Sequence, residues 1–332
     1  MTTRKLNRSI LFLSFLFCAA LALAQNPAPA PPPADAEPIS DPKPLKVKLN
    51  VLVLDNKGAP VTDLRAEDFQ VLEEGEAHKI LSFMHEPMPV SYALVMDNTG
   101  SMRSQLGVAG RAAASIVTGN RAEDETAVVR FVSSDNIERV QDFTSNQARL
   151  LNAFDELYVE GGQSAVIDAV YVSARYVADE SQRGAGRRRA LVLVTDGADR
   201  KSHYKLEELL NYLRATDVQV FAIGLVQELG TSMSAQKDSR QKAVGLLDTL
   251  TKETGGRVFY PETVEQLQAA VAAIQRDLHT QYVIEYRPTL QTDDSKYRKV
   301  QVKLADKPGA EKRTVITRAG YSITQAAPPK AK

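Results

Sequence analysis

The chain has 332 residues, of which 43% are hydrophobic and 25% are charged, as in an ordinary globular protein with a sizeable core. Its 41 basic and 41 acidic residues give a formal net charge of +0. This balance argues against nucleic acid as a partner, because a nucleic-acid-binding surface needs a basic surplus on one face. The length predicts roughly two domains.

Residues 1–24 have the parts of a secretory signal peptide. Basic residues at the start precede an apolar run, residues 10–23, and Ala22 and Ala24 are the small residues that a signal peptidase reads. We expect cleavage after Ala24 and a secreted or periplasmic protein. The run is short for a membrane span of about 20 residues, so no integral span is expected after cleavage. Cleavage also removes Cys18, the single cysteine, which excludes cysteine catalysis.

Two contrasting segments follow. Residues 25–44 are dominated by proline and alanine, which predicts an extended spacer. Residues 45–88 predict a β segment, because apolar residues alternate with polar ones or with neighbouring strand formers from Leu45 to Val53. Two more short strands are expected near residues 68–72 and 79–84, with a turn at Glu74-Gly75-Glu76 between them.

Residues 89–280 predict a doubly wound α/β domain. Strands are expected at residues 91–96, 125–131, 190–195 and 218–225, and most of their residues are apolar. Between and after them, apolar residues recur every three or four positions, which predicts amphipathic helices at residues 102–116, 167–177, 206–213, 244–250 and 264–278. Strands without a polar face, separated by such helices, are typical of a mostly parallel sheet that is covered on both sides.

The chain then returns to β structure. Residues 281–325 predict strands at 282–286, 299–304 and 314–317, and residues 326–332 form a tail. The fold class is therefore α/β with flanking N- and C-terminal β segments. One hypothesis is that the two flanking segments pair with each other around the α/β domain.

Polar residues collect where two apolar strands end. Asp97 follows the strand at 91–96 and Asp196 follows the strand at 190–195, and in the usual strand order these two strands are neighbours at the switch point where ligands bind. Thr99 and Ser101 can turn their hydroxyl groups to the same side as Asp97, and a Gly-Gly loop brings Ser164. Two carboxylates and three hydroxyls suit a hard divalent cation, with Mg²⁺ expected first and Mn²⁺ or Ca²⁺ as alternatives. The histidines show no ligand spacing, which disfavours zinc.

These elements resemble the metal-ion-dependent adhesion site of von Willebrand factor type A domains. Asp97-Asn98-Thr99-Gly100-Ser101 is similar to the family's Asp-x-Ser-x-Ser element, Gly161-Gly162-Gln163-Ser164 to its Gly-Gly-x-Thr loop, and Thr195-Asp196-Gly197 to its Thr-Asp-Gly element. The resemblance implies that Thr99, Ser101 and Ser164 contact the metal directly, whereas Asp97 and Asp196 act largely through bound waters. Thr99 stands for Ser and Ser164 for Thr, so we expect metal affinity to be altered more than abolished.

The likeness extends beyond the site. Asp55-Asn56-Lys57-Gly58, Val61-Thr62-Asp63-Leu64 and Glu67-Asp68-Phe69 resemble the leader of a bacterial family of exported type A–related proteins, and Arg318-Ala319-Gly320-Tyr321 resembles its ending. The similarity covers residues 46–321, which is most of the expected mature chain.

Simpler explanations exist for single residues. Asp97 alone could be a turn residue or a helix cap, and Ser164 could cap the next helix. Asp168 lies within a helical pattern and is interpreted as structural. The basic run at residues 183–189 is interpreted as a solvated loop, with docking of an acidic surface as the alternative. Phe259 and Tyr260 are expected to end a short strand and lie in the core, with an aromatic contact for a partner as the alternative.

The sequence favours a binding protein over an enzyme. It has no Gly-x-Ser-x-Gly elbow, and Thr99 stands where an aspartyl phosphatase needs a second aspartate. Metal-dependent hydrolysis would also need a general base, and no histidine lies near the three loops in the sequence. We therefore expect an exported adhesion-type module that captures an acidic side chain of a partner protein. A metal-dependent hydrolase and a structural envelope component are the alternatives.

Overall fold

The computed structural model describes residues 46–180, 186–228, 233–289, 297–305 and 311–322. The expected signal peptide, the spacer at residues 25–44 and the tail at residues 326–332 lie outside these ranges. None of the helices within them has the length and apolarity that crossing a bilayer requires.

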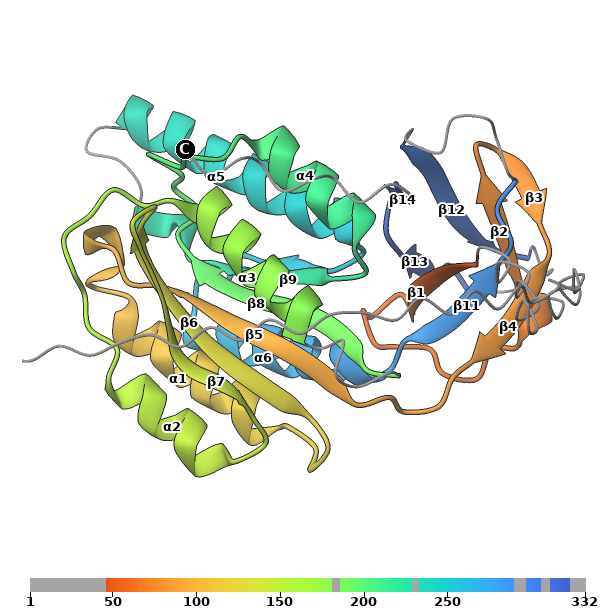
Figure 1. The fold of residues 1–332 in the computed structure, drawn as a ribbon, viewed down its shortest axis with the longest axis horizontal. Helices are drawn as coiled ribbons and strands as arrows, with labels where there is room; N and C mark the ends of the chain where they lie inside the picture. The colour runs from red at the N-terminus through yellow and green to blue at the C-terminus, as the bar shows by residue number, and fades with distance from the viewer. Residues whose placement is uncertain (1–45, 181–185, 229–232, 290–296, 306–310, 323–332) are drawn as a thin grey trace, which may run out of the picture. The chain divides into compact units, whose positions relative to one another are not determined.

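A six-stranded, mostly parallel sheet forms the centre of the α/β domain (Figure 1). Five strands are parallel and one edge strand is antiparallel. In spatial order they are β10 (Val258–Phe259), β9 (Gln219–Gly224), β8 (Arg188–Thr195), β5 (Val90–Asp97), β6 (Glu125–Ser133) and the antiparallel β7 (Asn136–Thr144). This arrangement confirms the predicted fold class.

Helices cover both faces of this sheet (Figure 1). One face packs against α1 (Leu106–Thr118), α2 (Gln147–Asp155) and α6 (Val264–His279). The other face packs against α3 (Val166–Glu180), α4 (Leu206–Ala215) and α5 (Met233–Thr254).

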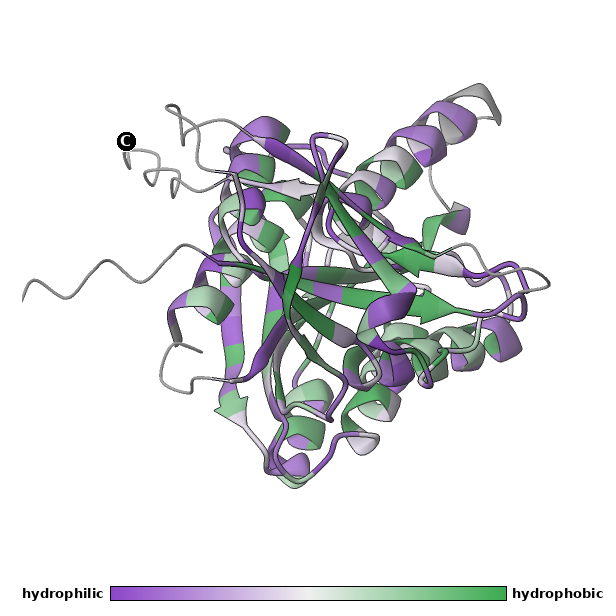
Figure 2. Ribbon diagram, turned by 90° about the vertical axis from the view of Figure 1, so that its right-hand side faces the viewer, coloured by the Kyte–Doolittle hydropathy of each residue, from purple (hydrophilic) through white to green (hydrophobic). Residues whose placement is uncertain are grey.

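The strand sequences explain why two layers of helices are needed. Within β5, Leu94 and Met96 face the α1 side, whereas Ala93 and Val95 face the α3 side. All of these side chains are fully buried, and the sheet strands are correspondingly hydrophobic along most of their length (Figure 2). A strand that is apolar on both faces is stable only when both faces are removed from water.

The two flanking segments form a second layered unit of two four-stranded sheets. One sheet has the order β13-β1-β11-β4 and the other has the order β14-β12-β2-β3. The N-terminal flank supplies β1 (Val47–Leu54), β2 (Phe69–Glu73), β3 (Glu76–His78) and β4 (Ile80–Met84). The C-terminal flank supplies β11 (Tyr282–Tyr286), β12 (Arg298–Leu304), β13 (Thr314–Ile316) and β14 (Gly320–Tyr321).

Both sheets combine strands from the two ends of the chain. β1 pairs with β11 from Val47↔Tyr286 to Val51↔Tyr282, and β2 pairs with β12 from Phe69↔Leu304 onwards. The two sheets share one hydrophobic core. This pairing confirms the hypothesis that the flanking segments associate with each other, and we call the resulting unit the β-sandwich.

A buried polar cluster joins the two flanks inside the β-sandwich. Glu73 accepts hydrogen bonds from the hydroxyls of Tyr286 (2.7 Å) and Tyr321 (2.9 Å) through its Oε2 atom. Its Oε1 atom accepts one from Arg298 Nη1 (3.1 Å). Both charged residues are buried. One carboxylate from the N-terminal flank therefore satisfies three donors from the C-terminal flank.

Two parts of the sequence interpretation need correction. The sequence analysis did not predict β3, β7, β14 and α2. β7 is half-exposed along its length and its register with β6 is irregular, so it has neither a continuous apolar run nor a clean alternation. The basic run is not a solvated loop throughout, although residues 183–185 lie outside the described ranges. Arg188 is buried and donates to the carbonyl of Leu278 (2.6 Å), in the last turn of α6, and to that of Gln281 (3.3 Å), just beyond it. Short 3-10 helices also occur at Ala66–Asp68, Gly100–Met102 and Val226–Glu228.

Candidate metal centre

Asp97 lies at the carboxyl end of β5, next to the end of β8. The two strands are parallel neighbours, as the sequence predicted. Thr195, the last residue of β8, donates its hydroxyl to Asp97 Oδ2 (2.5 Å). Thr99 donates both its backbone N–H (3.1 Å) and its hydroxyl (2.7 Å) to Asp97 Oδ1. Three donors from two strand ends therefore fix the orientation of this buried carboxylate.

The loop after Asp97 brings the next two hydroxyls to the same place. Thr99 Oγ1 lies 3.1 Å from Ser101 Oγ, so the oxygens of residues 97, 99 and 101 form a continuous hydrogen-bonded chain. The N–H of Met102 donates to Thr99 O (3.0 Å), which closes a tight turn. The side chain of Met102 is fully buried in the core and anchors that turn.

Asp196 follows β8 directly and is also buried. Its Oδ1 atom accepts from the N–H of Ala198 (2.8 Å). Its Oδ2 atom has no hydrogen-bond partner among the described residues. Gly197 turns the chain with a φ of 76°, a value that favours glycine, and a β-carbon there would lie 3.0 Å from Ala243 Cβ.

Ser164 comes from the Gly-Gly loop before α3. Gly162 permits the loop to lie close to β6, since a β-carbon at this position would lie 2.9 Å from Val132 O. The carbonyl of Ser164 accepts from the N–H groups of Arg200 (2.8 Å) and Lys201 (3.1 Å). These bonds tie the loop to the segment that follows Asp196. The Ser164 hydroxyl is buried and has no partner among the described residues, so it does not cap α3.

The electrostatics of the site favour a cation. Burial, and next the negative charge of Asp196, raise the pKa of Asp97 to about 6, while the hydrogen bonds from Thr195 and Thr99 act in the opposite direction. Within the described ranges, neither carboxylate forms an ion pair, and no third acidic residue, cysteine or histidine joins them in a metal-binding group. Two buried carboxylates without a counter-charge are costly to maintain.

The donor set fits a hard divalent cation. It consists of two carboxylates and three hydroxyls, and the buried Oδ2 atom of Asp196 and the Ser164 hydroxyl lack protein partners in the described part of the chain. Buried polar atoms in folded proteins nearly always have a partner. A bound ion would supply the one that is missing here.

Asp168, Asn98 and Thr195 support the loops around the candidate metal centre. Asp168 accepts from the backbone N–H groups of His203 (2.7 Å) and Tyr204 (2.8 Å), which fixes the loop after Asp196 and agrees with its expected structural role. The side-chain amide of Asn98 donates to Tyr158 O (2.9 Å), a role that the sequence did not predict. Thr195 belongs to the Thr-Asp-Gly element, which was the available signal for its role.

One correction concerns histidine. His203 was set apart from the three loops, but it lies in the segment that follows Asp196, only seven residues further along the chain. Its ring packs edge-on against the ring of Tyr204, with 5.4 Å between the ring centres.

Comparison with known proteins points to one family. The family model described as von Willebrand factor type A domain matches residues 92–198. This range begins in β5 and ends just after Asp196, so it contains all five candidate ligands. A search of curated proteins finds no match.

Solved structures give weaker similarities. An aerotolerance-related membrane protein from Bacteroides fragilis is 16% identical, with 57% of this chain and 98% of that chain covered and a TM-score of 0.44. A von Willebrand factor type A protein from Catenulispora acidiphila is 12% identical over 84% and 75% of the two chains, with a TM-score of 0.47. Proximal thread matrix protein 1 from the mussel byssus, with zinc in its MIDAS motif, is 17% identical over 60% and 48%, with a TM-score of 0.42.

The matched range includes most of β5 and all of β6, β7 and β8 of the six-stranded sheet. Over residues 92–198, this protein is therefore similar to von Willebrand factor type A domains.

Proposed function

We propose that this protein binds one divalent cation through Asp97, Thr99, Ser101, Ser164 and Asp196, and that the bound cation captures an acidic side chain of a partner protein. The observation that carries the proposal is the pair of unsatisfied oxygens, Ser164 Oγ and Asp196 Oδ2, beside a second buried carboxylate. All of these atoms lie at the carboxyl ends of neighbouring parallel strands or in the loops tied to them, which is where α/β sheets bind ligands.

The five residues would contribute to cation binding in two ways. Asp97 and Asp196 supply two negative charges that balance a dication, and Thr99, Ser101 and Ser164 supply neutral oxygens. An all-oxygen set favours Mg²⁺, with Mn²⁺ and Ca²⁺ as alternatives. A dication held by only two charged side chains would remain electron-poor and would attract a carboxylate of a partner. The hydrogen bonds from Thr195 and Thr99 keep the Asp97 carboxylate in place whether or not a partner is present.

We propose a binding module rather than an enzyme, exported to the periplasm or the medium. The acid–base group that hydrolysis would need is not among the five ligands, and the ring of His203 packs against Tyr204. Export rests on the signal-peptide pattern of residues 1–24. The intact mass of the protein recovered from its native location tests export, because a chain that begins at Gln25 is expected and a chain that retains residue 1 would contradict it.

Calorimetric titration with Mg²⁺ tests the metal site. The wild-type protein should release or absorb heat on binding, and Ser164→Ala should weaken binding by at least about 10-fold, because a removed ligand is worth more than about 1.4 kcal/mol. The Ser164 hydroxyl makes no hydrogen bond to described residues, so its removal should leave the fold intact. Asp97→Ala should abolish binding.

Ser173→Ala is the matched control. Ser173 also carries a buried hydroxyl without a described partner, but it lies within α3 and is not one of the proposed ligands. Equal Mg²⁺ affinity of the wild type, Ser164→Ala and Ser173→Ala would refute the metal site. Capture of an aspartate-containing peptide should then disappear when the cation is chelated, and capture that survives chelation would refute the proposed role of the cation.

A further inference from the structure

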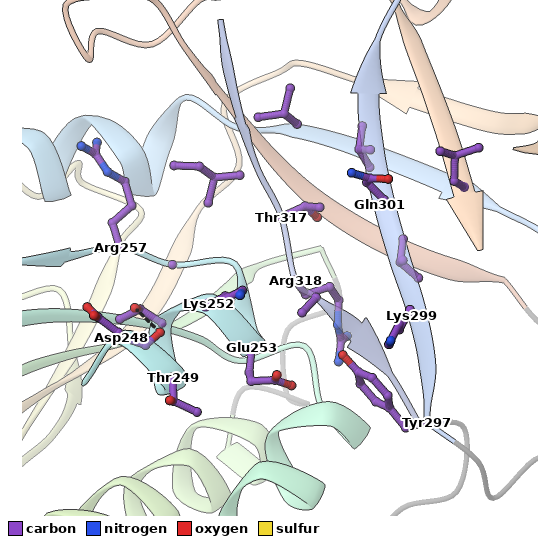
Figure 3. A pocket seen from close by; sticks show the side chains of 18 of the residues that line it. Asp248, Thr249, Lys252, Glu253, Arg257, Tyr297, Lys299, Gln301, Thr317 and Arg318 are labelled. Carbon is purple, nitrogen blue, oxygen red and sulfur yellow. Dashed lines mark hydrogen bonds between the residues drawn. The ribbon is translucent and has the colours of Figure 1, made fainter. Parts of the chain in front are cut away.

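A cleft of 1480 Å³ separates the C-terminal half of α5 from β12 of the β-sandwich (Figure 3). It shares no lining residue with the candidate metal centre. Lys252 and Thr249 lie on the α5 side, whereas Lys299 and Gln301 lie on the β12 side. The backbone between β13 and β14, at Thr317 and Arg318, lies between these two walls.

The cleft continues along β12 into a second hollow. This hollow has a volume of 460 Å³ and includes Lys303, Leu304 and Arg313 in its lining. Val302 and Val315 line both hollows, so the two are contiguous along the boundary between β12 and β13. We call the combined depression the β12 groove.

Part of the β12 edge in the groove pairs with no described strand. Backbone groups along an antiparallel strand point alternately toward and away from a given neighbour. Val300 N donates to Ala319 O (3.0 Å), away from β2, whereas Ala305 N donates to Asp68 O (2.8 Å), on the β2 side. The alternation therefore directs the N–H and C=O of Val302 away from β2. On that side β14 pairs only with Arg298 and Lys299, and β13 lies nearby without pairing to β12, so no described strand pairs with β12 at Val302.

The groove is also rich in basic residues without acidic partners. Five basic residues that line the groove form no ion pair within the described ranges: Lys252, Lys299, Lys303, Lys312 and Arg313. Most of the acids nearby are already engaged. Glu253 pairs with Arg214 (2.9 Å) and Glu74 accepts the N–H of Lys299 (2.6 Å), whereas Glu311 is exposed at the far end.

We propose that the β12 groove binds an extended acidic segment of a partner protein, which adds to the free edge of β12 as a further strand. The backbone of such a segment would pair with the free N–H and C=O of Val302. Its acidic side chains would meet the basic residues on both sides of the groove. An unprotected strand edge can pair with a strand of another chain. The lysines beside this edge favour a strand with acidic side chains.

The chain's own flanks are poorer occupants. β14 runs antiparallel to β12 from Gly320, opposite Lys299, to Tyr321, opposite Arg298, so this described strand ends at the end of β12 that is farther from Val302. The spacer at residues 25–44 is acidic in part, but its many prolines lack the N–H groups that strand pairing needs.

Fluorescence anisotropy with two labelled peptides tests the proposal. One peptide alternates valine with glutamate over eight residues, and the other replaces each glutamate with lysine. The wild-type protein should bind the glutamate peptide at least about 10-fold more tightly than the lysine peptide. The double variant Lys299→Glu/Lys303→Glu should reduce that affinity at least about 10-fold, because exposed attractive pairs become repulsive. Lys57→Glu, in the exposed turn between residues 55 and 58, is the matched control and should bind as the wild type does.

Hydrogen exchange supplies the second readout. The amide of Val302 should exchange readily in the free protein and become protected when the glutamate peptide is bound. Equal affinity for the two peptides, or binding without protection at Val302, would overturn the proposal. Competition by a synthetic peptide of residues 25–44, bound with the same protection, would instead assign the groove to the chain's own spacer and would also overturn it. None of these measurements needs a divalent cation, so they are independent of the metal site.

Discussion

Glu73→Ala should destabilise the β-sandwich more than any surface substitution. The change leaves the buried guanidinium of Arg298 without its carboxylate and removes the acceptor of the hydroxyls of Tyr286 and Tyr321. Burial is the main reason that the pKa of Tyr321 is raised to about 12, so this tyrosine remains a hydrogen-bond donor at neutral pH and needs an acceptor.

The magnitude follows from the partners that remain. Removing one member of a buried ion pair costs about 3–5 kcal/mol, and each unsatisfied hydroxyl adds about 1 kcal/mol. Arg298 retains a hydrogen bond to Thr289 O (2.5 Å), which lowers the total. We expect the free energy of unfolding to fall by about 4–6 kcal/mol. Glu73→Gln keeps one acceptor and should lose about half as much.

Urea denaturation followed by circular dichroism measures this loss, with Glu76→Ala as the control because Glu76 is exposed on the neighbouring β3. The control should lie within about 0.5 kcal/mol of the wild type. The double variant Glu73→Leu/Arg298→Met should recover much of the stability, because apolar side chains can replace a buried ion pair. If Glu73→Ala is as stable as Glu76→Ala, the cluster does not hold the two flanks together.

Two further predictions concern the α/β domain. Gly197→Ala should reduce both stability, by about 1–3 kcal/mol, and Mg²⁺ affinity, since residue 197 has a φ of 76° and a β-carbon there would press on Ala243; unchanged thermal unfolding and titration would contradict this. Asp277 is buried in α6, and burial outweighs its attraction to Arg257 (2.8 Å), which raises its pKa to about 6. Its contribution to stability is therefore fully present below its unfolded pKa of about 3.9 and is lost as the pH rises through about 6, by up to about 3 kcal/mol. Asp277→Asn should lack this part of the pH dependence, and parallel stability curves for the variant and the wild type would refute the assignment.

The sequence predicted the elements whose burial is complete. β5 and β8 are apolar on both faces, and a strand of that kind is recognisable without knowing its neighbours. β7 was missed because this edge strand keeps polar residues at most positions, and α2 was missed because it is short and buries only Leu150 and Ala153. The buried position of Arg188 could not be foreseen, since its partners are carbonyl groups about 90 residues away that carry no sequence signal.

The candidate ligands were predictable for a similar reason. Asp97 and Asp196 stand directly after apolar strands, so their place at one edge of the sheet follows from the strands alone. The Ser164 hydroxyl has no described partner because of the position of the Gly-Gly loop, which is fixed by hydrogen bonds from the N–H groups of Arg200 and Lys201 to Ser164 O. That detail requires three-dimensional contacts between loops far apart in the sequence.

The way the β-sandwich is assembled determines the order in which the protein can fold. Lys46 and Glu285 meet across paired strands although they are 239 residues apart in the chain. Closing a loop of that length in an unfolded chain is entropically unfavourable and slow. Once the α/β domain has folded, however, it replaces most of that loop with a rigid connection. During synthesis β1 to β4 emerge first and have no long-range partners until β11 and β12 follow, so the early strands depend on the α/β domain folding before them.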